Sequence, residues 1–480
     1  MNYSGSLMAT LNPIAMTKEL LNVKMHSIKD CQEVIDEIDN EVLAGEVRYR
    51  FAGQKEKFLK ELNEKLEQFD SISNALKFGE RKTSFHLVQK GTRFGIFSGY
   101  GISVIQPIEF LQIIPIHLES NNGFVFIAMN ENFKWGILEK KRSGNKETEI
   151  LPFIFEDINA PTEDIYPVKY YGKWGLYYSR GKEFVIEPQY EDASIIREGL
   201  WAVKKEGQWG FVDLFNNIQV PFEFEQVSDF SHGYTHAVLF SFMEDDGEVL
   251  INHQGKIVHF KNPQLYDDKY WHGLEVKKSY VNHEEYSYLV NDYGDIVIPK
   301  DKYRYLGRFS EGLLAASIDG DKLGFIDIEE NIVIPFEYRA ERWPDSWDNI
   351  FHHGFVTARL DDGKYSKECI LINHNNEKVF PHTFRCESLR FSNGRFENWK
   401  IGDRFKRNSI SLIDLINYQK GKDMSYLIRT DAEVEKELQR RRYAVQEPYE
   451  WTEEDTWDAM TDGMYGDYPG GDVDYEALGF

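Results

Sequence analysis

The sequence predicts a mainly β protein, built as an open array (solenoid) of about eight antiparallel repeats with three strands each. Two observations predict it. Aromatic residues make up 15% of the 480 residues, and flat rings pack well on pleated sheets. Short glycine-centred fragments also recur at intervals of 35–41 residues between residues 95 and 210, a period typical of repeat architectures.

The recurring fragments set the register of the array. Clear copies read GTRFGIF, KWGILE, KWGLYY, QWGFVD and KLGFID, with glycines at Gly95, Gly136, Gly175, Gly210 and Gly324. The wide gap after Gly210 spans three periods and holds two degenerate copies. Placed by phase, the degenerate copies have their register points at Val249, Tyr288 and Ile370. The phase therefore predicts eight units even where the Trp-Gly pair is lost.

One copy, residues 311–341, shows what a unit contains. LLAASI is a strand-length apolar run, DGD is a hairpin-turn signal, and KLGFIDI is a second strand. EEN is a second turn, and NIVIP is a third strand that ends at Pro335. Most other copies carry a proline at the same place. Each unit is thus expected to be three short antiparallel strands followed by a loop of about ten residues.

These motifs resemble the WG β-repeat (KWG-repeat) family of bacterial proteins, over roughly residues 84–420. The KWG and QWG cores at 134–136, 173–175 and 208–210 carry the resemblance, with IxPxxY-like strands at 185–190 and 332–338. The resemblance implies the β-repeat architecture. It implies no single biochemical activity, because one fold can serve many functions.

The Trp-Gly pairs are expected to be structural. Glycine allows a neighbouring backbone to approach closely or a bulge to form, and the tryptophan then covers the space. Stacking between units completes the core. A ligand-stacking platform is the alternative role for the tryptophans, and a closed β-propeller is the alternative architecture. The predicted structural repeat residues are Trp135, Gly136, Trp174, Gly175, Trp209, Gly210 and Gly324.

Four regions are expected. Residues 1–83 form a helical N-terminal segment or cap, in which Phe58, Leu62, Leu66 and Phe69 line one face of an amphipathic helix. Residues 84–390 form the repeat array. Residues 391–445 form a degenerate last repeat and a helical cap. Residues 446–480 form an acidic, aromatic tail, expected to be disordered in isolation.

The tail is the region with the clearest functional signal. It contains eleven Asp or Glu, seven aromatic residues and no Lys or Arg. Such a segment commonly folds on a partner that supplies a basic, apolar groove. A solubility tail and docking onto the protein's own array are the alternatives. The candidate partner-binding residues are Trp451, Trp457, Tyr465, Tyr468, Tyr475 and Phe480.

Composition argues against several function classes. The net charge of −24 disfavours nucleic acid and anionic membranes, since both need clustered Lys and Arg. The three cysteines are odd in number and scattered, so thiols rather than a disulfide framework are expected. In five copies an Asp or Asn lies three residues after the register point. These residues are interpreted as turn caps rather than metal ligands: Asp213, Asn252, Asn291, Asp327 and Asn373.

No catalytic, cofactor or metal site is predicted, and no cofactor is expected. No nucleophile or phosphate-loop signature occurs in a usable context. The N-terminus lacks the pattern of a signal peptide, which predicts a cytoplasmic protein. The sequence therefore favours a non-enzymatic protein–protein interaction scaffold, whose tail binds a protein partner. The alternative is a hydrolase or enzyme accessory with a site in the inter-repeat loops. The oligomeric state is left open.

Overall fold

The computed structural model describes fifteen stretches of the chain. They are residues 25–43, 55–78, 81–82, 85–99, 103–118, 123–141, 147–239, 247–271, 273–340, 349–361, 368–380, 384–385, 389–392, 395–398 and 408–422. Everything below concerns these residues. The described part of the array is antiparallel β structure with few helices, as the sequence predicts.

We number the repeats 1 to 8 by the register points Gly95, Gly136, Gly175, Gly210, Val249, Tyr288, Gly324 and Ile370. The strands of repeats 1 and 2 are β5 (Phe85–Lys90), β6 (Arg93–Ser98), β7 (Ser103–Phe110), β8 (Gln112–Leu118), β9 (Gly123–Met129), β10 (Trp135–Lys141) and β11 (Glu147–Phe155). Those of repeats 3 and 4 are β12 (Asp157–Ile158), β13 (Ile165–Tyr170), β14 (Lys173–Tyr178), β15 (Glu183–Tyr190), β16 (Asp192–Arg197), β17 (Leu200–Lys205), β18 (Gln208–Asp213) and β19 (Ile218–Val227).

The second half of the array is less regular. The strands of repeats 5 and 6 are β20 (Tyr234–Leu239), β21 (Glu248–Asn252), β22 (Glu275–Val281), β23 (Glu284–Val290) and β24 (Ile296–Tyr303). Those of repeats 7 and 8 are β25 (Tyr305–Leu306), β26 (Leu314–Ser317), β27 (Lys322–Ile326), β28 (Ile332–Arg339), β29 (Phe355–Arg359), β30 (Glu368–Asn373) and β31 (Phe384–Arg385). A last sheet contains β32 (Leu389–Ser392), β33 (Arg395–Asn398) and β34 (Asn408–Ser411).

The sheets differ from the expected three-stranded unit in one systematic way. In repeats 3 and 7 a short fourth strand, β12 or β25, pairs in front of the first strand. In repeats 2 and 4 the longer strands β8 and β16 do the same, and the sheet of repeat 4 continues through β19 into β20 and β21. The segment expected to be a loop between units therefore supplies an edge strand, because its backbone groups need partners beside the next hairpin.

Two helices lie at the N-terminal end of the described array. They are α2 (Gln32–Leu43) and α3 (Lys55–Leu66), next to the short strands β1 (Met25–Ser27), β2 (Ser71–Ser73), β3 (Lys77–Phe78) and β4 (Arg81–Lys82). A 3-10 turn, η2 (Ile28–Asp30), precedes α2. Phe58, Leu62 and Leu66 of α3 pack with Val88 and Phe97 of the first sheet. The helices thereby cover the apolar side of repeat 1.

Three other helical elements interrupt the strands. Between repeats 5 and 6 lie two 3-10 turns, η3 (Pro263–Tyr266) and η4 (Asp268–Trp271). The helix α4 (Leu412–Gln419) follows β34 and begins with a capping box between Ser411 and Asp414. Within the described residues, no helix is both long enough and apolar enough to cross a membrane.

The register glycines are required by a bulge in the third strand. Pairing shifts register between Trp174 and Leu176, so the β15 backbone bends toward β14. A Cβ atom on Gly175 would lie 2.6 Å from the carbonyl oxygen of Ile186, and one on Gly324 would lie 2.7 Å from that of Ile334. Since real Cβ atoms do not approach backbone atoms so closely, only glycine fits. At Gly136 the close neighbour is instead the ring of Phe153, at 2.7 Å.

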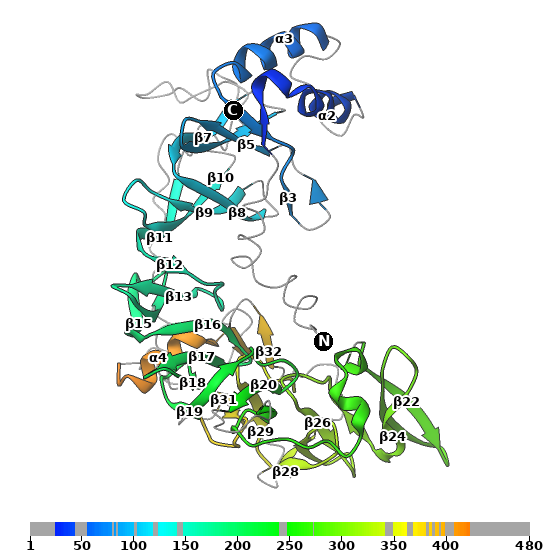
Figure 1. The fold of residues 1–480 in the computed structure, drawn as a ribbon. Coiled ribbons are helices and arrows are strands. Elements are labelled where there is room, and N and C mark those ends of the chain that lie inside the picture. The colour runs from blue at the N-terminus through cyan, green and yellow to red at the C-terminus, as the bar shows by residue number, and fades with distance from the viewer. Residues whose placement is uncertain are drawn as a thin grey trace, which may run out of the picture.

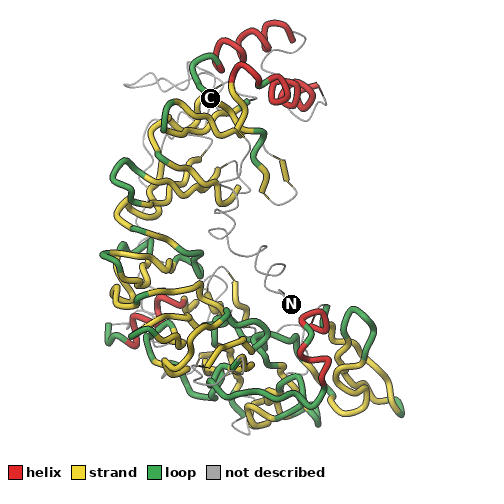
Figure 2. Tube along the Cα trace, in the orientation of Figure 1, coloured by secondary structure: helices red, strands yellow, loops and turns green. Residues whose placement is uncertain are grey.

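The array follows a curved path and then returns on itself. Figure 1 shows the sheets running from α2 and α3 at one end to β22 and β24 at the other. Figure 2 shows that strands dominate this path, with helices at few places. The helix α4 and repeat 8 lie beside repeats 3 and 4, and one core joins Trp201 and Val212 to Leu371, Phe380 and Leu415. The described strands form a series of open sheets rather than one closed barrel.

Candidate functional site

The three tryptophans of the Trp-Gly pairs differ in exposure. Trp174 is only 4% exposed and belongs to the main core, whereas Trp135 and Trp209 are partly buried. Each ring is paired across the sheet with an aromatic residue of the third strand: Trp135 with Phe155, Trp174 with Tyr190, and Trp209 with Phe224. Their surroundings are those of core side chains.

The glycines of the same motif lie buried at the centre of their hairpins. Gly136, Gly175, Gly210 and Gly324 are all enclosed by the third strand of their repeat. The candidate tail residues, Trp451 to Phe480, lie outside the described part of the chain. The structure therefore brings the repeat residues together as packing elements.

In repeats 4 to 8, an Asp or Asn at the end of the second strand caps a turn. The Oδ1 atom of Asp213 accepts hydrogen bonds from the backbone N–H groups of Phe215 and Asn217, at 2.9 and 2.8 Å. Asn373 Oδ1 does the same with Asn375 and Glu377, at 3.0 and 2.9 Å. Within the described stretches, no three His, Cys, Asp or Glu side chains form a group that could hold a metal ion.

Four tight turns from repeats 4, 5, 7 and 8 meet at one place. Each turn consists of a residue and a glycine, both with left-handed φ: Glu198–Gly199 (51° and 78°), His232–Gly233 (55° and 88°), Glu311–Gly312 (50° and 80°) and His353–Gly354 (53° and 87°). A Cβ atom on Gly233 would lie 2.4 Å from the Cα of Gly312, and one on Gly199 would lie 2.3 Å from the carbonyl oxygen of His353. The turns touch backbone to backbone, which requires glycine.

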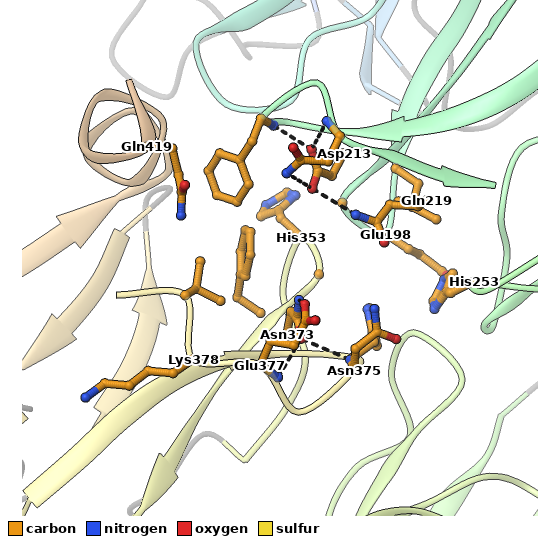
Figure 3. Close-up of a pocket in the computed structure, with 18 residues that line it drawn as sticks. Glu198, Asp213, Gln219, His253, His353, Asn373, Asn375, Glu377, Lys378 and Gln419 are labelled. Carbon is orange, nitrogen blue, oxygen red and sulfur yellow. Dashed lines mark hydrogen bonds and ion pairs between the residues drawn. The ribbon is translucent and has the colours of Figure 1, made fainter. Parts of the chain in front are cut away.

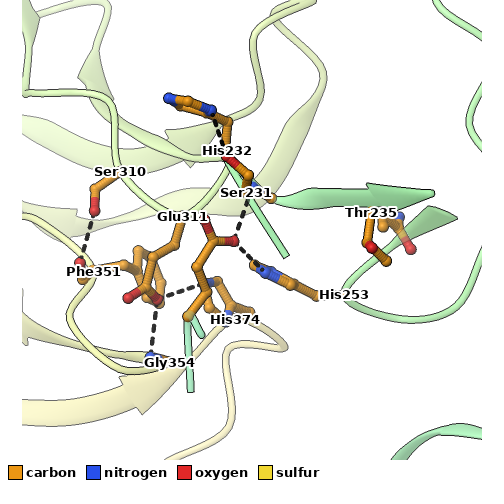
Figure 4. A network of polar contacts seen from close by, with 12 residues as sticks. Ser231, His232, Thr235, His253, Ser310, Glu311, Phe351, Gly354 and His374 are labelled. Atoms are coloured by element: carbon orange, nitrogen blue, oxygen red, sulfur yellow. Dashed lines mark hydrogen bonds and ion pairs between the residues drawn. The ribbon is translucent and has the colours of Figure 1, made fainter. Parts of the chain in front are cut away.

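Around these turns, two quasi-equivalent carboxylate–imidazole pairs are built (Figure 4). In one, Glu198 Oε2 accepts from Gly233 N at 2.9 Å and lies 2.8 Å from His253 Nε2. In the other, Glu311 Oε2 accepts from Gly354 N at 2.9 Å. His374 Nε2 lies 3.3 Å from Glu311 Oε2, at ion-pair distance. Each carboxylate thus ties its own repeat to the following turn and to a histidine.

The two histidines face each other. The ring centroids of His253 and His374 are 4.3 Å apart, with an interplanar angle of 43°. Each ring also packs on a phenylalanine: His253 on Phe230 at 4.6 Å, and His374 on Phe351 at 4.3 Å. We call Glu198, His253, Glu311 and His374 the His–Glu cluster. It joins repeats 4 and 5 to repeats 7 and 8.

Burial shapes the protonation of the second pair. Burial and the nearby charge of His253 lower the pKa of His374, against the opposing effect of Glu311. Burial alone would raise the pKa of Glu311. The contact with His374, the charge of His253 and the Gly354 N–H together hold that pKa below its ordinary value. The pair therefore favours an ionised carboxylate, and it resists a further proton on His374.

A polar cleft adjoins the cluster between repeats 4 and 8 (Figure 3), with a volume of about 160 Å³. Its lining includes Glu198, His253, His353 and His374, together with the turn caps Asp213 and Asn373. The caps are already hydrogen-bonded within their own turns, so their oxygens are committed to the fold. His353 contributes a second ion-pair contact, with its Nε2 atom 3.6 Å from Glu163 Oε1.

Sequence reasoning does not find this cluster. The Gly-plus-strand landmark at EGLWAV, HGLEV, EGLLAAS and HGFVTA is visible in the sequence, but no known motif explains why the residue before the glycine is either Glu or His. Neighbouring residues on a strand point to opposite faces, a rule that argues against a joint role for His352 and His353. His353 lies instead in a turn, where that rule does not hold.

The expectation that the cysteines are thiols is corrected at Cys369, which is disulfide-bonded, whereas Cys31 is free and buried.

The fold and these repeat positions define an antiparallel β-repeat protein. The family model for WG-containing repeats matches residues 145–174, 177–209, 209–235 and 289–320. The chain is a WG-repeat protein. The fourth match begins directly after Tyr288, the register point of a copy that has lost its Trp-Gly pair. The recognition of a WG-repeat family from the sequence is thereby confirmed.

No curated protein sequence matches the chain. Among solved structures, a eukaryotic initiation factor aligns at 8% identity with a TM-score of 0.24, covering 63% of this chain and 86% of that one. PorZ, a surface component of the type-IX secretion system of Porphyromonas gingivalis, aligns at 10% identity with a TM-score of 0.21, covering 66% and 48%. An acylaminoacyl peptidase of Pyrococcus horikoshii aligns at 10% identity with a TM-score of 0.24, covering 48% and 42%. Similarities this weak transfer no function.

Proposed function

We propose that the protein is a non-enzymatic interaction scaffold, whose array binds a protein partner along one recurring row of exposed aliphatic side chains. In each repeat, one residue pairs across the hairpin with the residue that lies two positions after the register point. The row consists of these residues. It is apolar and exposed in five repeats: Val104 (39%), Ile218 (58%), Ile257 (48%), Ile296 (50%) and Ile332 (59%). We call these five residues the aliphatic row.

The equivalence of these positions rests on strand pairing. Val104 pairs with Phe97, Ile218 with Val212, and Ile332 with Ile326. Ile296 pairs with Val290, and Ile257 forms a bridge with Ile251. In every case the inner partner is buried while the row residue is exposed. Scattered single apolar residues are ordinary on a surface, but recurrence at one register position is the observation that supports the proposal.

The row is not continuous through all eight repeats. The matching position is Glu149 in repeat 2, the partly buried Phe184 in repeat 3 and Lys378 in repeat 8. Repeats 4 to 7 therefore carry the longest apolar stretch. The whole chain has a net charge of −24, which favours a partner that is basic and presents apolar side chains. Exposed side chains that recur in consecutive repeats suit a partner that spans several repeats.

The test compares two triple variants of the full chain. Ile218→Thr, Ile296→Thr and Ile332→Thr keep β-branching, and therefore strand propensity, while they remove apolar surface. The matched control replaces exposed aliphatics outside the row: Ile154→Thr, Val281→Thr and Ile318→Thr, which are 40%, 36% and 50% exposed. Tagged proteins are used to capture partners from the cell that makes the protein, with quantitative mass spectrometry.

At roughly 1 kcal/mol per position, the row variant is expected to bind the captured partner about a hundredfold more weakly. The control is expected to bind as wild type does. Equal capture by both variants would show that the exposed isoleucines serve strand propensity only. The alternative function, a hydrolase or enzyme accessory, would be favoured instead if substitution at His353 abolished turnover of a generic ester or peptide substrate by the purified chain.

A further inference from the structure

The array has to hold repeats 7 and 8 against repeats 4 and 5, which lie far away in sequence. Apolar packing of Phe355, Leu371 and Phe380 against the core of repeats 3 and 4 supplies part of that attachment. Close to this packing lies the His–Glu cluster, in which two buried pairs meet through their imidazole rings. A buried polar network is destabilising when some of its groups lack hydrogen-bond partners. The protonation state of the His–Glu cluster therefore affects how firmly repeats 7 and 8 are held against repeats 4 and 5.

We infer that the His–Glu cluster is an acid-sensitive latch, which joins repeats 4 and 5 to repeats 7 and 8 at neutral pH and releases them as the pH falls. The inference goes beyond the proposed function, because it concerns the shape of the array and requires no partner. Its basis is the placement of two titratable rings 4.3 Å apart between two halves of the array.

Each element packed at the junction contributes a titratable or charged group. The turn before β17 contributes Glu198, and the turn before β26 contributes Glu311. The turns that follow β21 and β30 contribute His253 and His374. The turns before β20 and β29 contribute His232 and His353, the latter 3.6 Å from Glu163 of repeat 3. Tyr234, near Glu198, has a pKa raised by burial and by surrounding carboxylates, so it stays neutral.

The direction of the pH effect follows from the two shifted groups. The pKa of His374 is lower in the folded state than the ordinary value of 6.5. As the pH falls through that ordinary value, the opened state takes up a proton that the closed junction resists, so closure becomes less favourable. The lowered pKa of Glu311 adds a second loss of stability, which begins only below its ordinary value of 4.5. Between pH 7.5 and pH 5 the contribution of His374 therefore dominates.

Protonation also changes the local forces directly. An imidazolium at His374 would face the ring of His253, which is itself in contact with Glu198 at 2.8 Å. Glu311, 3.3 Å away, offsets part of the cost of that charge, but burial and the neighbouring imidazole outweigh it, which is why the pKa of His374 is lowered. The apolar neighbours Phe230 and Phe351 offer no hydrogen bonds. Separation of the two halves admits water, which solvates the new charge.

Hydrogen exchange of the full-length protein tests the latch. The reporters are the backbone amides of Gly233 and Gly354, which donate to Glu198 and Glu311. After correction for intrinsic exchange rates, protection of peptides that span these amides is expected to fall at least about tenfold from pH 7.5 to pH 5. Peptides from β6 and β10, which lie outside the junction, serve as the internal reference and are expected to keep their protection.

Two variants separate the cluster from other titrating groups. In the double variant His253→Gln and His374→Gln, the new side-chain amides can still donate to the carboxylates but cannot titrate, so protection is expected to be the same at both pH values. The control His236→Gln removes the exposed contact between His236 and Glu248, 3.1 Å apart, and is expected to keep the wild-type response. Small-angle scattering should show wild type expanding on acidification, with the double variant unchanged.

The inference is overturned if wild-type protection at Gly233 and Gly354 stays constant down to pH 5. It is also overturned if the internal reference peptides lose protection equally, because the whole fold would then be failing. A double variant that retains the wild-type response would assign the effect to other groups. Should the double variant not fold, the wild-type comparison with the reference peptides, together with the single variant His374→Gln, still decides the outcome.

Discussion

His253 and His374 come from repeats 5 and 8, yet their rings lie 4.3 Å apart. Each follows a Glu-Gly turn and a His-Gly turn in its own half of the array, and each packs on a phenylalanine, Phe230 or Phe351. The two halves therefore present the same arrangement to each other. This self-complementary contact explains how an array of open sheets returns on itself instead of running on as a straight solenoid.

The contact between Gly199 and the His353 backbone should be the most sensitive point of this junction. We expect Gly199→Ala to destabilise it severely, since the new Cβ would lie 2.3 Å from the His353 carbonyl oxygen and the left-handed φ of 78° adds strain. The measurement is exchange protection at Gly233 and Gly354 in the variant at pH 7.5. Gly354→Asn is the matched control, because its nearest neighbour lies 3.5 Å away and Asn tolerates left-handed φ.

The close approach of repeats 4 and 8 would be contradicted by one result: exchange protection stays at the wild-type level in Gly199→Ala and is lower in Gly354→Asn. Loss of protection in both would mean that left-handed strain, rather than the contact, limits substitution at these turns.

The register glycines should tolerate no side chain. Gly175→Ala places a Cβ atom 2.6 Å from the Ile186 carbonyl oxygen, so we expect a loss of roughly 2–4 kcal/mol in the free energy of unfolding. Gly207→Asn is the comparison. That glycine has a φ of 80°, but a Cβ atom added there would have no neighbour within 4 Å, and the cost of the substitution should stay below about 1 kcal/mol. Denaturant unfolding followed by tryptophan fluorescence measures both.

The loss of stability on replacing each tryptophan by alanine should increase with the depth at which its ring is buried. Trp174 is 4% exposed, and we expect Trp174→Ala to lower the free energy of unfolding by roughly 3–5 kcal/mol. Trp209→Ala should cost clearly less, because that ring is partly exposed and already packs loosely beside Lys204. Thermal melts of the two variants provide the comparison. Equal losses would mean that the tryptophans contribute through their hairpins rather than through burial between repeats.

The sequence predicted the repeat phase because glycine and proline mark turns and bulges locally. Gly175 and Gly324 could be placed by spacing alone, and the structure gives the reason in the carbonyl oxygens of Ile186 and Ile334. The short fourth strands of repeats 3 and 7 could not be predicted. The two-residue elements β12 and β25 show no alternation of apolar and polar residues, and their pairing depends on the next hairpin.

The His–Glu cluster was beyond prediction for a different reason. Glu198 and His253 lie 55 residues apart, and they meet only because repeats 4 and 5 adjoin. The contact between the two halves depends on the curvature of the whole array, which small rotations between repeats determine. A single sequence encodes such rotations in many weak contacts rather than in one motif. What could be noticed in advance was that Glu-Gly or His-Gly recurs before the first strand of these repeats.

The tail, residues 446–480, is expected to bind a partner in trans. Its eleven acidic and seven aromatic residues suit a basic groove with apolar pockets, so captured partners should dissociate as salt is raised. Trp451→Ala with Trp457→Ala should abolish capture, because large aromatics dominate interface energies. The matched control, Met460→Ala with Met464→Ala, removes two apolar side chains from the same segment and should retain capture. Mass spectrometry of the co-purified proteins gives the readout.

Deletion of residues 446–480 distinguishes the three roles open to the tail. Binding in trans predicts that specific partners are lost while the melting temperature stays within about two degrees of wild type. Docking onto the protein's own array predicts a lower melting temperature, because intramolecular contacts at high effective concentration contribute directly to stability. A solubility tail predicts neither change, only earlier aggregation on concentration, since the deletion removes eleven of the chain's 80 acidic residues. An unchanged set of partners together with an unchanged melting temperature would exclude both binding roles.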